Sequence, residues 1–167
     1  MNTLLWLIVL LPFAGALILA IFGAGLPKKA AGLVGCASVG GAWVLTILVG
    51  WNILSRSAPS PMNASLYPWM DVAGFKASMG LHLDPLSLIY IFVITFVGFL
   101  IHLYAAQSMY EEDGYSRFFC YMNLFVGSML TLVLADNLLL LYLGWEGVGL
   151  CSYLLIGFWY KEIANIH

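Results

Sequence analysis

Charged side chains are the scarcest feature of this 167-residue sequence. Asp, Glu, Lys and Arg make up only 8% of it, whereas a soluble globular domain carries about 25%. Hydrophobic residues make up 63%, and the mean hydropathy is +0.98. So little charge could not keep so much apolar surface dispersed in water. The composition therefore excludes a soluble globular domain and predicts an integral membrane protein.

Basic residues and cysteines are also scarce, and each scarcity excludes a class of function. Six Lys and Arg against eight Asp and Glu leave a net charge of −2 and no basic patch, so we expect no nucleic acid partner. Cys36, Cys120 and Cys151 stand singly in apolar runs, whereas one iron–sulfur cluster takes about four thiolates. We therefore expect no cofactor and no metal site in this chain, and packing roles for the cysteines.

Long apolar runs are abundant, and five of them reach the roughly 20 residues that cross a bilayer. These runs are Thr3–Phe22, Ala30–Trp51, Leu86–Ala106, Phe118–Ala135 and Leu138–Tyr160. The predicted fold class is therefore an all-α integral membrane protein with about five transmembrane helices.

The one long connection follows the second run. Its first part, Ser55–Ser65, is rich in Ser, Pro and Asn and predicts an irregular loop. In Phe75–Leu83 apolar and polar residues alternate, as in a half-buried strand. Leu66–Val72 could pair with that strand across Ala73-Gly74. We expect a small external β-hairpin between the second and third helices.

Asp84 and Pro85 open the third run. Asp is a preferred N-cap residue, and Pro suits the first helical position because its missing N–H would have no partner there. We expect Asp84 to cap this helix rather than to handle protons.

Glu146 lies eight positions into the fifth run, roughly 12 Å from its start at 1.5 Å per residue. An acidic side chain near the centre of a transmembrane helix costs about 2.5–3.5 kcal/mol, and such residues are commonly functional. Tyr142 and Tyr153 share its helical stripe. Small residues surround it, which leaves room for water or for a close helix: Gly144, Gly147, Gly149, Cys151 and Ser152. Glu146 is therefore either a proton-coupling carboxyl with two flanking hydroxyls or a structural one.

His102 is the second candidate, and it lies on a small and polar face of the third run with Thr95 and Gly98. Its ordinary pKa near neutrality suits a proton relay, but a satisfied packing histidine has the same sequence signature. A similar face recurs in the fourth run, formed by Cys120, Asn123, Gly127 and Thr131.

The segments Leu134–Leu138 and Tyr142–Tyr160, which include the run GWEGVG, closely resemble the NADH–quinone oxidoreductase subunit L family. This is the family of the largest antiporter-like subunit of respiratory complex I. Leu83–Leu88 and Gly114–Phe119 also look like that family. The resemblance covers essentially the whole chain and implies its N-terminal portion only, because the family's chain is several times longer.

The resemblance implies a membrane-arm subunit that carries no cofactor and contributes to proton translocation coupled to electron transport. It implies the other membrane subunits of complex I as partners, in a bacterial inner membrane. Residues 1–83 would form a two-helix segment with the hairpin, and residues 84–167 the start of the antiporter-like domain. The glutamate that matches Glu146 is paired in the family with a lysine on a later helix.

None of the six basic residues lies inside a predicted span, so the partner of Glu146 has to lie outside this chain. We therefore expect the chain to be inactive alone. The resemblance implies that it carries out no redox chemistry itself. Two other functions stay open: a subunit of a Mrp-type cation/proton antiporter, and a membrane scaffold in which Glu146 only holds helices together.

We expect the N-terminus and the connection 52–83 to lie outside the membrane, because inner loops carry an excess of Lys and Arg. That topology puts Lys28, Lys29, Arg117 and Lys161 inside, against Arg56 and Lys76 outside. The variants Ser57→Cys and Ser116→Cys test it with a thiol reagent that cannot cross the membrane. Position 57 should react from the outer face; labelling of position 116 from that face would contradict the topology.

Overall fold

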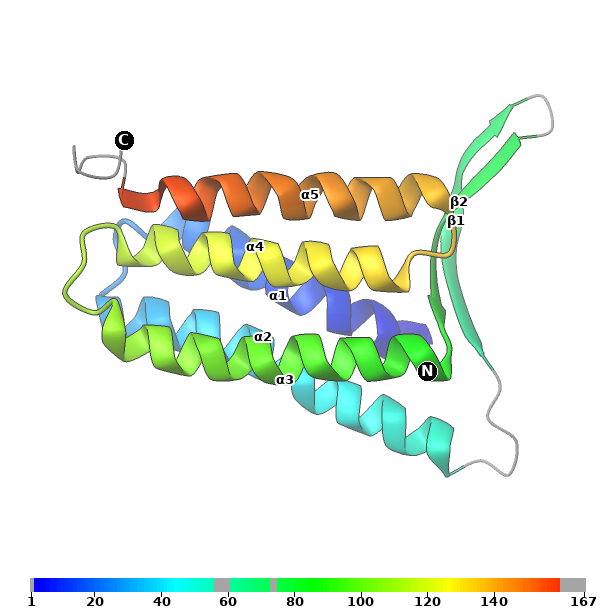
Figure 1. Cartoon of the computed structure of the whole chain (residues 1–167), viewed down its shortest axis with the longest axis horizontal. Helices are drawn as coiled ribbons and strands as arrows, with labels where there is room; N and C mark the ends of the chain where they lie inside the picture. Colours follow the sequence, from blue (N-terminus) through cyan, green and yellow to red (C-terminus); the bar gives the residue numbers. More distant parts are fainter. Residues whose placement is uncertain (1, 56–60, 73–74, 160–167) are drawn as a thin grey trace.

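Five helices form the body of the protein in the computed structural model, which describes residues 2–55, 61–72 and 75–159 (Figure 1). They are α1 (Asn2–Phe22), α2 (Lys28–Leu54), α3 (Pro85–Ser108), α4 (Tyr115–Leu134) and α5 (Leu138–Ile156), and a short 3-10 turn, η1 (Gly157–Trp159), follows α5. All five helices are long and apolar enough to cross a membrane. The predicted all-α, multi-pass membrane fold is confirmed, and the predicted spans match the helices to within a few residues at each end.

The helix α4 is the hub of the bundle, because it packs against each of the other four helices. The helix α1 also packs on α2, and α2 on α3, so the segments before and after the hairpin share one bundle. The helix α5 lies at one edge and packs mainly on α4, as the upper ribbon of Figure 1 shows. Because α5 lies at the edge, α4 covers one of its faces and the side chains of the opposite face are exposed.

A predicted hairpin follows α2, and it is longer than the sequence pattern indicated. Strand β1 (Met62–Val72) pairs antiparallel with β2 (Phe75–Leu83), with Met62 opposite Leu83 and Ala64 opposite Leu81. The predicted irregular loop over Ser55–Ser65 is therefore wrong for its last four residues. Met62 and Ala64 are buried against the helix ends, and this burial together with the strand pairing overrides their loop-like composition.

The hairpin lies across one end of the helices and is tied to the connection between α4 and α5 (Figure 1). The backbone N–H of Asp136 donates to the Gly80 carbonyl at 3.2 Å, and Asn137 Nδ2 donates to the Ser78 carbonyl at 2.7 Å. The Ser78 hydroxyl donates to the Asp136 carboxylate at 3.0 Å. Asn137 also caps α5, because its Oδ1 accepts from the Leu140 N–H at 3.0 Å. One short connection thus starts α5 and holds β2.

Asp84 caps α3, as predicted. Its carboxylate accepts from the Ser87 N–H at 2.6 Å, while the Asp84 N–H donates to Ser87 Oγ at 2.8 Å, which completes a reciprocal capping box. The hydrogen bond from the Ser87 hydroxyl, followed by that from its N–H, lowers the pKa of Asp84. Both interactions stabilise the point at which the hairpin passes into α3.

Two glycines allow α5 to approach α4 closely. A Cβ atom at Gly144 would lie 2.6 Å from the backbone nitrogen of Leu132, and one at Gly147 would lie 2.6 Å from the Ser128 hydroxyl oxygen. A neighbouring backbone cannot give way as the end of a side chain can. Gly144 is therefore the position at which this helix pair requires a glycine.

Alanine at Gly144 should lower the stability of the chain by about 1–3 kcal/mol, because the added methyl overpacks against the α4 backbone. The matched control is Gly149→Ala on the same helix, where a Cβ meets nothing within 4 Å. The control should keep or slightly raise stability, since alanine favours helix by up to about 1 kcal/mol over glycine. Unfolding in mixed micelles, followed by circular dichroism, measures both. Equal losses at the two positions would contradict this account of the helix contact.

Asn137→Ala should cost about 1–2 kcal/mol, because it removes both the cap of α5 and the hydrogen bond to the Ser78 carbonyl. Asn137→Ser keeps a capping oxygen but is too short to reach Ser78, so it should cost about half as much. The same unfolding measurement separates the two contributions. A serine variant as unstable as the alanine variant would mean that the cap contributes nothing.

Candidate functional site

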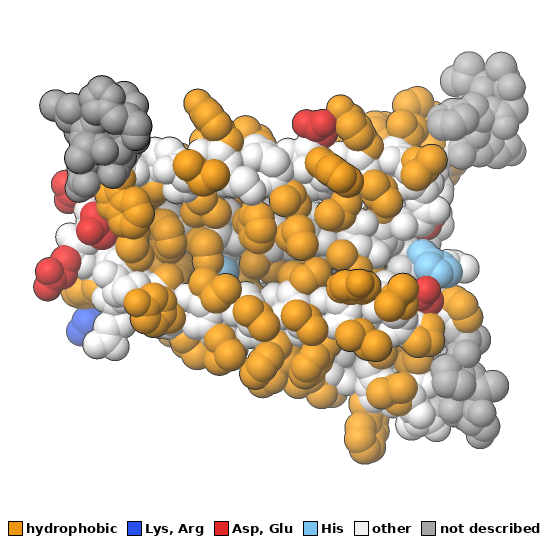
Figure 2. Space-filling view, viewed as in Figure 1, with side chains coloured by type: hydrophobic (Ala, Val, Ile, Leu, Met, Phe, Trp, Pro, Cys, Tyr) orange, Lys and Arg blue, Asp and Glu red, His pale blue; other side chains and the backbone are white. Residues whose placement is uncertain are grey.

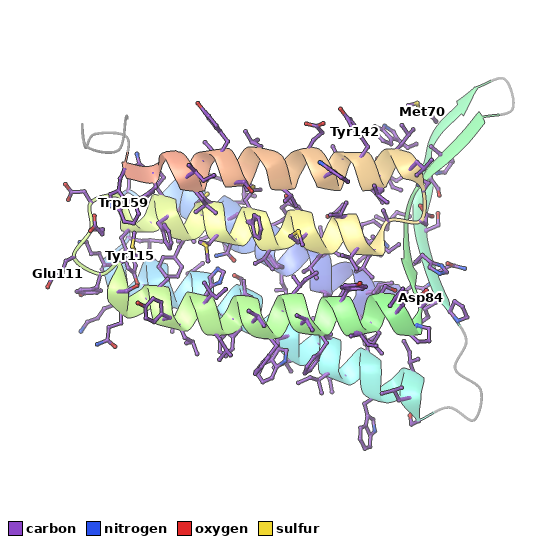
Figure 3. The ribbon with its side chains drawn as sticks, in the orientation of Figure 1. Met70, Asp84, Glu111, Tyr115, Tyr142 and Trp159 are labelled. Atoms are coloured by element: carbon purple, nitrogen blue, oxygen red, sulfur yellow. The ribbon has the colours of Figure 1, made fainter. Side chains whose placement is uncertain are left out.

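The helix α5 is the least buried of the five helices. It carries large exposed side chains: Leu138, Tyr142, Leu143, Trp145, Leu150, Tyr153 and Ile156. Glu146, the one acidic residue in the sequence of α5, is exposed on the same helix. In Figure 2 an acidic side chain stands among hydrophobic ones along this edge, and Figure 3 shows Tyr142 pointing away from the other helices. An acid thus lies midway along a membrane helix without burial in the described bundle.

The predicted stripe of polar groups does share one face of α5. The Tyr142 hydroxyl donates to the Glu146 carboxylate one helical turn later. Gly149 and Tyr153 are exposed at the following positions of the stripe, with 75% of the Tyr153 surface accessible. Only the first of the two tyrosines therefore reaches the carboxylate, and the second extends the polar stripe toward the other end of the helix.

The small residues near Glu146 divide between the two faces of α5. Gly144 and Cys151 are buried, and a Cβ atom at Gly144 or Gly147 would press against α4. Gly149 alone among these glycines opens onto the face of Glu146 with empty space around it. Most of the small residues thus serve the contact with α4, and one leaves space beside the acid for another group.

The basic side chains of the described residues lie far along the chain from Glu146. They occupy the first turns of α2 and α4: Lys28, Lys29 and Arg117. Lys28 donates to the carbonyls of Tyr110 and Glu112, and Arg117 stacks on the Phe158 ring. Lys28 and Arg117 are thus engaged near the ends of helices, away from the middle of α5 where Glu146 lies.

His102 is enclosed, in contrast to Glu146. Its side chain is 0% exposed and its Nδ1 lies 2.7 Å from the Gly98 carbonyl oxygen. Its Nε2 lies 3.5 Å from Asn123 Nδ2 of α4, and Phe119 packs edge-on against the ring. The structure does not bring His102 and Glu146 together, because one lies inside the bundle and the other faces away from it.

Ser38 belongs to the same polar cluster and was not among the sequence candidates. Its hydroxyl hydrogen-bonds to Asn123 Oδ1 and lies 2.9 Å from the Gly35 carbonyl oxygen. Ser38 is the one serine in the sequence of α2, and it stands three residues after Gly35. That spacing alone does not show that its hydroxyl points inward to α4.

Metal-binding residues do not gather in the part of the chain that the structure describes: no group of three or more His, Cys, Asp or Glu side chains could hold an ion. The three cysteines have free thiols and stand on three different helices, α2, α4 and α5. The Glu146 carboxyl, the two tyrosine hydroxyls and the His102 ring are groups that can donate or accept protons.

Two family descriptions match this chain. Residues 69–119 match "NADH-Ubiquinone oxidoreductase (complex I), chain 5 N-terminus", and residues 135–167 match "NADH:quinone oxidoreductase/Mrp antiporter, TM". The first match contains His102 and the second contains Glu146 with both tyrosines.

Curated relatives share this sequence over nearly its whole length. NADH-quinone oxidoreductase subunit L of Escherichia coli K12 is 48% identical over 162 residues, which cover 97% of this chain and 26% of that protein. The proteins of the same name from Pseudomonas aeruginosa and Mycobacterium tuberculosis H37Rv are 47% and 45% identical, over 97% and 94% of this chain and 26% and 25% of theirs. The chain thus spans about a quarter of the length of these relatives. With identity of this level from end to end and both family matches in agreement, the chain belongs to the NADH-quinone oxidoreductase subunit L family.

Proposed function

We propose that this chain is part of a membrane-arm subunit of a proton-translocating NADH–quinone oxidoreductase. In this proposal it contributes to proton translocation coupled to electron transport and takes no part in the redox chemistry. The observation that carries the proposal is Glu146, a carboxyl midway along a membrane helix on a face that the described bundle leaves uncovered. The names of the relatives and the antiporter family match support the same function.

Glu146 is the proton-coupling residue in this proposal, with Tyr142 as its hydrogen-bond partner and Tyr153 further along the same face. A carboxylate in lipid needs a cation or a hydrogen-bond network to hold its charge. The cation comes from polypeptide outside the described residues, on a helix that covers the α5 face and fills the space beside Gly149. Approach of the cation favours the charged carboxylate and its withdrawal favours the protonated acid. Such a pair can take up and release a proton in step with a conformational change.

The proposed location is a bacterial inner membrane with the N-terminus and the hairpin outside. The proposed partners are the other membrane subunits of complex I. The outer half of β1 supports a protein contact, because its apolar residues Leu66, Tyr67, Trp69 and Met70 are exposed by 37–60% where the hairpin projects beyond the bundle (Figures 1 and 3). Residues 84–167 would form the start of the antiporter-like domain, and His102 is a second proton-handling group.

A Mrp-type cation/proton antiporter is the alternative, because the second family description names both classes. Membrane vesicles distinguish the two functions. Proton uptake driven by NADH supports the oxidoreductase, whereas proton uptake driven only by a sodium gradient supports the antiporter.

Glu146→Gln in the full-length subunit of the assembled complex should lower NADH-driven proton pumping by roughly tenfold or more, the scale of losing one proton-transfer group. Glutamine keeps the shape and can still hydrogen-bond to Tyr142, but it cannot take a charge. Glu146→Asp keeps the carboxyl on a side chain one methylene shorter, so it should reduce pumping less.

Native gel electrophoresis supplies the control, since both variants should assemble as the unsubstituted complex does. If Glu146 only holds helices together, the order reverses: glutamine is tolerated and the shorter aspartate is the weaker variant. Normal pumping with glutamine in an assembled complex would therefore assign the residue a structural role.

A further inference from the structure

A polar cluster interrupts the apolar interior of the bundle away from the α5 face. It consists of Ser38 on α2, His102 on α3 and Asn123 on α4, and the last two are 0% exposed. The helix α1 also reaches the cluster, through Gly15. A Cβ atom at Gly15 would lie 2.5 Å from Ser38 Oγ and 2.9 Å from Asn123 Oδ1. Four helices therefore meet at this cluster, and a buried set of this kind is costly unless every donor and acceptor is used.

The hydrogen bonds define where the proton of the neutral His102 ring sits. Nδ1 lies 2.7 Å from the Gly98 carbonyl, which can only accept, so Nδ1 carries the hydrogen. Nε2 of a neutral ring is then an acceptor, and it faces the Asn123 amide nitrogen at 3.5 Å. The same amide nitrogen donates its other hydrogen to the Phe119 carbonyl at 2.9 Å.

Ser38 has a choice of two acceptors. Its single hydrogen can go to Asn123 Oδ1 or to the Gly35 carbonyl at 2.9 Å. While His102 is neutral, Asn123 directs both amide hydrogens to Phe119 and His102, and its oxygen accepts from Ser38. Every polar atom of the three side chains is then used.

A second proton on His102 would turn Nε2 into a donor that faces the donor nitrogen of Asn123. Reversal of the Asn123 amide removes this conflict, because Oδ1 then accepts from Nε2 and the amide nitrogen turns toward Ser38. The Ser38 hydroxyl rotates to the Gly35 carbonyl and accepts from Asn123. Two side-chain rotations, of the Asn123 amide and of the Ser38 hydroxyl, thus convert one arrangement into the other without movement of a helix, and the Phe119 carbonyl gives up the Asn123 side-chain hydrogen in the exchange.

A positive charge on the His102 ring has to be stabilised by the groups of the cluster itself and not by charged side chains nearby. The titratable side chains in the neighbouring part of the core are Cys36 on α2 with Tyr115 and Cys120 on α4. The charged or basic side chains of the elements packed on α3 lie toward its two ends: Lys28, Lys29 and Arg117 at one, His82 and Asp84 at the other. Among the described residues, the ring nitrogens of His102 contact the Gly98 carbonyl and the Asn123 amide.

We propose that Ser38, Asn123 and His102 form a proton-binding switch, in which uptake of a proton by His102 reverses the Asn123 amide and redirects the Ser38 hydroxyl. The purpose of this switch rests on the proposed role in proton transfer, whereas proton binding by the switch does not. Binding of the proton is measured at equilibrium, without NADH, quinone or pumping. Failure of the switch and failure of the proposed function are therefore separate results.

Solid-state NMR of the whole chain in lipid bilayers tests the switch, with ¹⁵N in the histidine rings and asparagine side chains. The variant His102→Gln identifies the His102 signals among the three histidines. At alkaline pH only Nδ1 of His102 should carry a proton. On acidification within about pH 4–9, the range that brackets the ordinary histidine titration, both nitrogens should become protonated. The Asn123 side-chain signal should move over the same pH interval.

Two substitutions of Asn123 should shift that titration in opposite directions. Asn123→Leu leaves the protonated ring without an acceptor, so the midpoint should fall by at least about one pH unit, a tenfold loss of proton affinity. Asn123→Asp has the same shape and offers a counter-charge, so the midpoint should rise by at least about one unit. Circular dichroism checks folding, and the aspartate variant decides the question if the leucine variant does not fold.

A His102 ring that stays neutral over the whole pH range would overturn the proposal. So would a ring that carries its proton on Nε2 at alkaline pH, or midpoints that do not differ between the unsubstituted chain and the folded variants. Each of these results would make the cluster a fixed packing contact between helices.

Discussion

The close contact of α4 with α5 is the constraint on which the candidate site depends. Gly144 and Gly147 turn toward α4, where an added methyl group at Gly144 would strike backbone, so the rotation of α5 about its axis has little freedom. Residues two positions along a helix point to a different side, and Glu146 therefore faces away from α4. The exposure of this acid is a consequence of how the helix pair packs and not of a loosely held side chain.

The connection between α4 and α5 adds a second constraint at the end of the same helix pair. Asn137 fixes the first turn of α5 through its side-chain oxygen and holds the Ser78 carbonyl of β2 through its side-chain nitrogen. Trp6 of α1 donates to the Ala64 carbonyl of β1 at 3.1 Å. Both strands of the hairpin are thus tied to the helix ends, although a lone two-stranded sheet has marginal stability in water. The hairpin gains its order from the helices and in return sets the position where α5 begins.

Much of this fold could be predicted from composition and pattern, and the exceptions have physical reasons. Apolar run length locates the helices because the bilayer sets their length, and Asp84-Pro85 marks a helix start through local chemistry alone. The composition of Met62–Ser65 predicts a loop, whereas its strand structure comes from pairing with β2 and from the burial of Met62 and Ala64, which composition does not encode. The stripe around Glu146 follows from helical periodicity, but which face α4 covers depends on contacts between distant residues. Ser38 was missed for the same reason.

Glu146 and His102 represent two ways in which a membrane protein can stabilise a charge within the bilayer. Glu146 has a single hydrogen-bond partner from its own helix, so a stable charge there requires a cation brought by other polypeptide. His102 lies among carbonyl, amide and hydroxyl groups from three helices, and in the proposed switch the amide and the hydroxyl reorient to accept a positive charge on the ring without a counter-ion. In the proposed roles, the first group responds to the movement of a neighbouring helix and the second to the local proton concentration. These two roles require no contact between the Glu146 carboxyl and the His102 ring, which the structure places on the outer face of α5 and inside the bundle.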